Sequence, residues 1–213
     1  MITIKIILPF HIRLTIVSAF ICIVATLITA PVEATETIVM LRHAEKPDGG
    51  LGQINCQGLN RALALPRVLL KKYGVPSAIF VPNPSVRKND QGHEYSYIRP
   101  LATIEPTAIR FSLPINTQWG FEDIEPLKKA LLSPELQDAT IIVAWEHRLL
   151  EKLARDILIK LGGDPREVPV WEGYDFDSIY VITLEKNTEG RRAVAFLIDK
   201  EGLNNQSATC PSE

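Results

Sequence analysis

The chain has 213 residues, of which 46% are hydrophobic and 23% are charged, with a formal net charge of −2. This length is enough for one domain with a buried core, and the composition is that of an ordinary folded protein. No block or stripe of basic residues occurs, so the sequence lacks the electrostatic footprint of a nucleic-acid-binding protein.

The N-terminus resembles an export signal. Basic residues precede an apolar stretch over residues 14–30, and Val32 and Ala34 then fit the small-residue rule for signal-peptidase cleavage after Ala34. The sequence therefore predicts a signal peptide over residues 1–34 and one folded domain over 35–213, exported to the periplasm or the extracellular space. We expect no membrane contact after cleavage. An uncleaved membrane anchor is the alternative, because the apolar region is somewhat long.

Export changes the interpretation of the cysteines. Cys22 would leave with the signal peptide, so Cys56 and Cys210 remain, an even number in an oxidising compartment. The sequence predicts a disulfide between them, which would tie the C-terminal tail to the start of the first helix. Two free thiols are the alternative.

The first half of the domain predicts alternating strands and helices. An apolar, β-branched run predicts a strand over residues 37–41, and a glycine-rich loop follows. An amphipathic pattern predicts a helix over 57–73 that Pro66 bends or divides. The apolar positions expected on its broad buried side are Leu59, Leu63, Leu65, Val68, Leu69 and Leu70. A second strand is predicted over 78–81.

The second half continues this alternation after a polar segment, residues 82–97, that predicts an exposed loop. The predicted helices span 99–110, with a bend at Pro106, then 124–132 and 148–161; the predicted strands span 113–116, 140–145, 178–184 and 193–198. This order is typical of a three-layer α/β/α sandwich with a mainly parallel central sheet.

The first predicted strand ends in Arg42 and His43. Open α/β folds bind ligands at the carboxyl edge of the sheet, where these two side chains would lie. Arginine binds anions through a planar fork of donors, and a neutral imidazole is a nucleophile. Together they indicate chemistry on a phosphoryl group.

The segment VMLRHAEKP, residues 39–47, resembles the Arg-His-Gly signature of the histidine phosphatase superfamily, the phosphoglycerate-mutase-like fold, with Ala44 in place of the glycine. The resemblance extends over roughly residues 37–198. It implies that His43 attacks phosphorus to form a phosphohistidine, that Arg42 and a second arginine hold the phosphate oxygens, and that a second histidine completes the pocket. It implies no metal and no cofactor.

The second arginine of the resemblance falls on Arg99. Arg99 and Thr103 keep an Arg-x-x-x-Thr spacing similar to the superfamily's pattern, which implies that both bind the phosphate. The start of a helix also offers free N–H groups and a positive dipole end to an anion. Arg87 in the polar segment is a rival, but it lacks the threonine and lies in a flexible-looking region.

The second histidine falls on His147, which follows the predicted strand 140–145 as His43 follows the first strand. The resemblance implies that His147 binds phosphate oxygens. His93 lies in the polar segment and receives no role.

A general acid must protonate the leaving oxygen. Glu122 and Asp123 follow the second arginine, as the acid does in the mutase branch, and they are the preferred candidates. Glu146 precedes the second histidine, whereas the phytase branch has its acid directly after it, where this chain has Arg148. Glu45 is close to His43 in sequence, but neighbouring side chains often point apart. Each of these carboxylates could instead be a solvated surface charge.

Together these features predict an exported, metal-independent phosphatase of the histidine acid-phosphatase type, which hydrolyses small phosphomonoesters through a phosphohistidine. The chain shows no Asp/His cluster with two-metal spacing, and its length leaves no room for a large cap domain. The alternative is a non-catalytic phosphate-binding or regulatory protein with the same fold.

Overall fold

Six strands form one sheet in the order β5-β2-β6-β1-β7-β8 in the computed structural model, which describes residues 35–186 and 192–211. The predicted signal peptide lies outside the described residues, among which no helix is long and apolar enough to cross a membrane. Strands β5, β2, β6 and β1 pair in parallel, and β7 runs antiparallel between β1 and β8. The bounds are β1 Thr35–Arg42, β2 Ala78–Phe80, β5 Ile115–Asn116, β6 Thr140–Trp145, β7 Ser178–Lys186 and β8 Arg192–Lys200.

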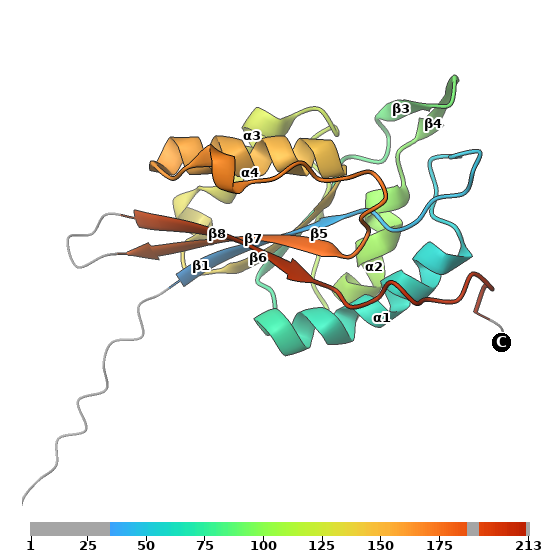
Figure 1. Cartoon of the computed structure of the whole chain (residues 1–213), viewed down its shortest axis with the longest axis horizontal. Coiled ribbons are helices and arrows are strands. Elements are labelled where there is room, and N and C mark those ends of the chain that lie inside the picture. The colour runs from blue at the N-terminus through green and yellow to red at the C-terminus, as the bar shows by residue number, and fades with distance from the viewer. Residues whose placement is uncertain (1–34, 187–191, 212–213) are drawn as a thin grey trace, which may run out of the picture. The chain divides into compact units, whose positions relative to one another are not determined.

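Helices cover both faces of this sheet (Figure 1). Val39 and Leu41 of β1 pack in one core with α1 and α2, while Ile38 and Met40 pack in a second core with α3 and α4. This division follows from the strand, whose successive side chains point to opposite faces. The predicted three-layer α/β/α fold is therefore confirmed. The helices are α1 Cys56–Tyr73, α2 Arg99–Phe111, α3 Ile124–Leu131 and α4 His147–Leu161, with two short 3-10 helices at Pro134–Leu136 and Pro165–Glu167.

Helix α1 departs from its predicted buried face. It continues unbroken through Pro66, and it buries Arg61, Ala62, Leu65 and Leu69. The expectation that Leu63 and Leu70 are buried is wrong, because these side chains are 53% and 40% exposed. The buried positions recur every three or four residues and so share one side of the helix. Leu63 and Leu70 lie seven residues apart on a different side.

The segment predicted as an exposed loop contains a β-hairpin. Strand β3 (Arg87–Asp90) pairs with β4 (His93–Ser96), from Arg87 opposite Ser96 to Asp90 opposite His93. The two turn residues, Gln91 and Gly92, have φ angles of 56° and 86°, which suits a two-residue hairpin turn with glycine second. Alternation along β3 places Lys88 and Asp90 on one side of the hairpin.

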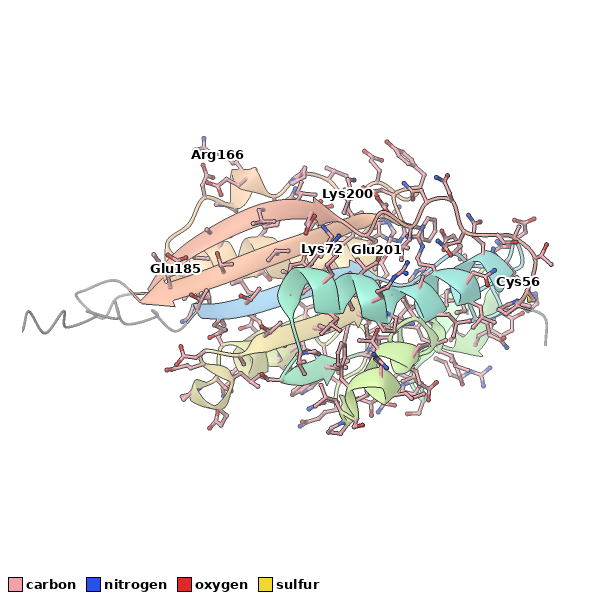
Figure 2. The ribbon with its side chains drawn as sticks, turned by 90° about the horizontal axis from the view of Figure 1, so that it is seen from below. Cys56, Lys72, Arg166, Glu185, Lys200 and Glu201 are labelled. Atoms are coloured by element: carbon pink, nitrogen blue, oxygen red, sulfur yellow. A yellow bond between two sulfur atoms is a disulfide. The ribbon has the colours of Figure 1, made fainter. Side chains whose placement is uncertain are left out.

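The predicted disulfide between Cys56 and Cys210 is confirmed, and it joins residues 154 positions apart. Cys56 begins α1, and the C-terminal segment approaches the helix there (Figure 2). Asn60 of the same helix donates hydrogen bonds from Nδ2 to the backbone carbonyls of Ser207, at 2.9 Å, and Thr209, at 2.8 Å. The C-terminal segment is thus tied to α1 both covalently and by hydrogen bonds.

Replacing both cysteines, by Cys56→Ser with Cys210→Ser, should lower the free energy of unfolding by up to about 5 kcal/mol, because the disulfide closes a long loop in the unfolded chain. Urea unfolding of the oxidised wild type and the double variant measures the loss. Reduction of the wild type should reproduce it. Equal midpoints for the three samples would contradict a stabilising tether.

Candidate active site

The parallel register of β1 and β6 brings the two predicted histidines to one edge of the sheet. Arg42 lies opposite Trp145, and the His43 N–H donates to the carbonyl of Trp145 at 3.0 Å. His43 and the Glu146–His147 pair therefore leave the sheet beside each other, at the carboxyl ends of two parallel strands. Such edges are where open α/β sheets bind their ligands.

His43 is held as a neutral imidazole with one free nitrogen. The residue is 5% exposed, and its Nδ1 lies 2.8 Å from the carbonyl oxygen of Ala44. A carbonyl only accepts hydrogen bonds, so Nδ1 carries the proton and Nε2 keeps its lone pair. Burial, followed by the positive charge of Arg42, lowers the pKa of His43 to about 3, although the Ala44 contact opposes this. His43 is thus a neutral potential nucleophile at physiological pH.

Arg42 is fixed beside His43 by the segment that precedes β7. Its guanidinium lies 3.8 Å from the ring centre of Phe176, and Nη1 donates to the carbonyls of Gly173 at 2.8 Å and Asp175 at 3.1 Å. The buried Nε has no hydrogen-bond partner among the described residues. Burial lowers the pKa of Arg42 to about 10, so the side chain stays charged at neutral pH. A fixed cation with a spare donor suits an anion.

Arg99 is the first residue of α2, and its side chain is 3% exposed. Its two terminal nitrogens form an ion pair with Asp90 of the hairpin, and Nη1 lies 3.0 Å from Asp90 Oδ2. Lys46 Nζ lies 3.3 Å from the other oxygen of Asp90. The Nε of Arg99 is buried and without a partner in the described part of the chain. The hairpin therefore places a carboxylate on the predicted phosphate-binding arginine.

The side chain of Thr103 links α2 to the loop that follows His43. Its buried Oγ1 accepts a hydrogen bond from the Ala44 N–H at 2.9 Å and donates to the Arg99 carbonyl at 2.8 Å. The hydroxyl thus joins the first turn of α2 to the loop that follows His43. The Arg-x-x-x-Thr spacing serves here to align the arginine with the histidine.

His147 opens α4, and Glu146 caps that helix by accepting from the Leu149 N–H at 3.0 Å. His147 Nδ1 lies 2.9 Å from Glu146 Oε1. The other ring nitrogen, Nε2, lies on the Gly173 side of the ring, about 4.0 Å from where a Cβ of Gly173 would be. Burial raises the pKa of Glu146, but His147, Lys88 and the Leu149 N–H together lower it to about 2. Glu146 is therefore ionised and orients His147.

Tyr97 and Lys88 are site residues that the sequence did not reveal. The Tyr97 ring meets the His43 ring edge-on, with centroids 6.2 Å apart. The ammonium of Lys88 lies 4.7 Å from the ring centres of both Tyr97 and Phe121. Burial lowers the pKa of Lys88, and the charge of Glu146 opposes that shift. The glycine at 92 was the available signal, and it marks the turn of the hairpin that carries Lys88.

The carboxylates considered as general acid have different surroundings. Glu122 and Asp123 are exposed, and Asp123 Oδ2 accepts from the Gly120 N–H at 2.8 Å. Glu45 is buried and bound by Arg61, whose Nε and Nη2 lie 3.0 Å and 2.7 Å from its oxygens. Within the described ranges, no group of three or more His, Cys, Asp or Glu residues could hold a metal ion.

No protein-family model matches this chain, and no curated protein does. Among solved structures, it is similar to a putative phosphohistidine phosphatase SixA from Nakamurella multipartitia, with 14% identity, 78% of this chain and 95% of the other covered, and a TM-score of 0.49. A phosphoglycerate mutase from Plasmodium falciparum has 13% identity, 76% and 89% coverage and a TM-score of 0.49.

A mycobacterial glucosyl-3-phosphoglycerate phosphatase, solved with inorganic phosphate, has 16% identity, 77% and 95% coverage and a TM-score of 0.49. At such identities, the roles of individual residues must come from the geometry of this chain's own site.

The imidazole of His43 should remain neutral far below the ordinary histidine pKa. Because burial and Arg42 lower the pKa of His43 to about 3, its ring should stay unprotonated on Nε2 as pH falls from 7 to 5. Nitrogen-15 NMR of the His43 imidazole over this pH range tests the expectation. A His43 titration near pH 6.5 would contradict the described environment.

Proposed function

We propose that this protein is a metal-independent phosphatase that hydrolyses small phosphomonoesters through a phosphohistidine on His43. The observation that carries the proposal is the tautomer of His43. The Ala44 carbonyl holds the proton on Nδ1, so a neutral Nε2 is available for attack on phosphorus. Nucleophilic catalysis by histidine requires this arrangement.

The cations around His43 suit the charge of the reaction. The transition state of phosphoryl transfer spreads negative charge over three equatorial oxygens, so cationic clamps supply much of the catalysis. Arg42 and Arg99 each keep a buried Nε donor for those oxygens, and His147 is the third proposed contact. The first turn of α2 adds the positive end of a helix dipole, although the Arg99 N–H itself donates to the Gly52 carbonyl at 3.0 Å.

In the proposed reaction, His43 Nε2 attacks phosphorus and the bond to the leaving oxygen breaks. Water then attacks the phosphohistidine, phosphate leaves, and His43 returns to its starting form. Neither step uses a metal or a cofactor.

We also propose that the protein acts outside the cytoplasm, with residues 1–34 as its signal peptide. The disulfide supports this assignment, because such bonds persist mainly in oxidising compartments. The periplasm and the extracellular space both satisfy this condition.

A non-catalytic phosphate-binding protein is the second candidate, and the ion pair between Asp90 and Arg99 favours it, since a carboxylate already contacts one proposed clamp. The two functions differ in turnover of p-nitrophenyl phosphate and in the formation of a phosphohistidine. Rapid denaturation at alkaline pH would preserve that intermediate, and mass spectrometry would locate it. A wild type that binds phosphate but gives neither signal would be the non-catalytic protein.

His43→Ala should abolish turnover of p-nitrophenyl phosphate, because it removes the proposed attacking nitrogen. Losing the covalent route removes several kcal/mol of barrier lowering, at roughly tenfold in rate for each 1.4 kcal/mol. Thermal unfolding serves as the control for an intact fold. Near-wild-type activity in this variant would show that His43 is not the nucleophile.

Arg99→Ala should lower kcat/KM for phosphomonoesters by roughly two orders of magnitude or more, since it removes a transition-state clamp. Arg87→Ala is the matched control, because Arg87 is exposed on the neighbouring hairpin and donates to the carbonyl of Glu94. We expect little effect there. The reverse ranking would place the phosphate contact on the hairpin arginine.

A further inference from the structure

We propose that Asp90 of the β3–β4 hairpin is the general acid of this site, which protonates the leaving oxygen as the phosphohistidine forms. The inference rests on the proposed phosphatase function. It starts from position: Asp90 is 8% exposed and contacts Arg99, one of the two arginines proposed to hold the phosphate. A carboxyl group within reach of that guanidinium is also within reach of a phosphate ester bound to it.

The other carboxylates near His43 are committed to other contacts. Glu45 is bound by Arg61, and Glu146 caps α4 and contacts His147. Asp175 accepts hydrogen bonds from the N–H groups of Asp177 and Ser178, at 3.0 Å each. Asp90 differs from these three because both of its partners, Arg99 and Lys46, are cations that would themselves attract a phosphate.

The hairpin is built to hold Asp90 at this place. Gly50 has a φ of +72°, and a Cβ added to it would lie 2.2 Å from Asp90 Oδ2, so the loop after His43 approaches the carboxylate as only glycine allows. Gln91 donates from its side chain to the carbonyl of Asp48 in the same loop. In Figure 1 the hairpin and the loop after β1 project from the same end of the sheet.

Binding of substrate would convert Asp90 from an ion-pair partner into an acid. In the structure, Arg99 and Lys46 hold the pKa of Asp90 below its usual range, although burial opposes them. A phosphate dianion on Arg99 would compete for that cation and place negative charge beside the carboxylate. Both changes raise its pKa and favour the uptake of a proton from solvent.

The proton balance is complete over the two steps. In the first step, His43 Nε2 forms a bond to phosphorus, the P–O bond breaks, and the leaving oxygen takes the proton of Asp90. In the second step, Asp90 as a carboxylate accepts a proton from the attacking water, and the N–P bond breaks as phosphate forms. His43 returns neutral, and Asp90 is protonated for the next cycle.

Asp90→Asn tests this role through its dependence on the leaving group. A general acid raises the rate roughly 10²–10⁴-fold when the leaving oxygen is basic. It raises the rate little when the leaving group departs readily without a proton. The variant should therefore lose roughly 10²-fold or more in kcat/KM for an alkyl phosphate such as glycerol phosphate. For 2,4-dinitrophenyl phosphate the loss should be less than about tenfold. A merely structural role would reduce both substrates equally.

Glu94→Gln is the matched control, because it makes the same chemical change on an exposed residue of the same hairpin, and it should leave both substrates unaffected. An equal loss on both substrates in Asp90→Asn would overturn the inference. The inference would also be overturned if Glu122→Gln or Asp123→Asn, rather than Asp90→Asn, selectively lost activity on the alkyl phosphate. If Asp90→Asn does not fold, the test uses the wild type and a series of phosphate esters. A steep fall of kcat/KM as the pKa of the leaving group rises would show that no general acid acts, and it would overturn the inference.

The same measurements separate this inference from the proposed function. A wild type that hydrolyses none of these esters would refute the phosphatase function itself. A wild type that hydrolyses them and traps phosphate on His43, while Asp90→Asn keeps the same ratio of alkyl to aryl rates, would refute only the role of Asp90.

Discussion

The parallel pairing of β1 with β6 is the constraint on which the site depends. Arg42 lies opposite Trp145, and this register alone places His43 next to the residues that begin α4. The register is fixed by the two cores, because Ile38 and Met40 enter one and Val39 and Leu41 enter the other. A slip of one residue would exchange these side chains between the cores and turn His43 to the opposite face. Packing of β1 thus determines where His43, the proposed nucleophile, lies.

Behind the loop that follows His43, one buried guanidinium joins three parts of the chain. Arg61 of α1 contacts Glu45 of that loop, Glu201 after β8, and Asp177 before β7. One cation serves three buried carboxylates, and burial raises the pKa of Glu201 to about 7 despite its contact with Arg61. Buried ion pairs add little net stability compared with apolar packing, but breaking one is costly. Their contribution here is to fix the position of the loop, which a preorganised electrostatic site requires.

Local patterns were enough to predict the elements whose burial is continuous. Strand β6 has the predicted bounds, 140–145, because its residues form one continuous apolar, β-branched run. The pair Arg42 and His43 was recognisable because it interrupts such a run at a strand end. The hairpin β3–β4 could not be found in this way. Its side chains are almost all polar, and the burial of Asp90 depends on tertiary contacts with Arg99, Lys46 and the loop at Gly50.

Local sequence patterns also do not show which residues of the site contact each other. The sequence placed Glu45 beside His43 but could not show that Arg61, sixteen residues later, binds it. It gave Thr103 the correct spacing from Arg99, whereas the contact with Ala44 depends on how α2 docks against β1. A residue type indicates which contacts are chemically possible, and only the tertiary packing selects one of them.

The burial of the site around His43 explains why the proposed phosphate clamps are arginines. Burial lowers the pKa of Arg42 to about 10, and the side chain remains a cation at neutral pH. A lysine, whose ordinary pKa is about 10.4, would lose more of its charge under the same burial. Arg42 in turn helps to keep His43 neutral, so one side chain would serve both the proposed phosphate site and the proposed nucleophile. Asp90 and Glu146 offset the cations of the site, which lowers the cost of burying Arg42 and Arg99 beside an imidazole that must stay uncharged.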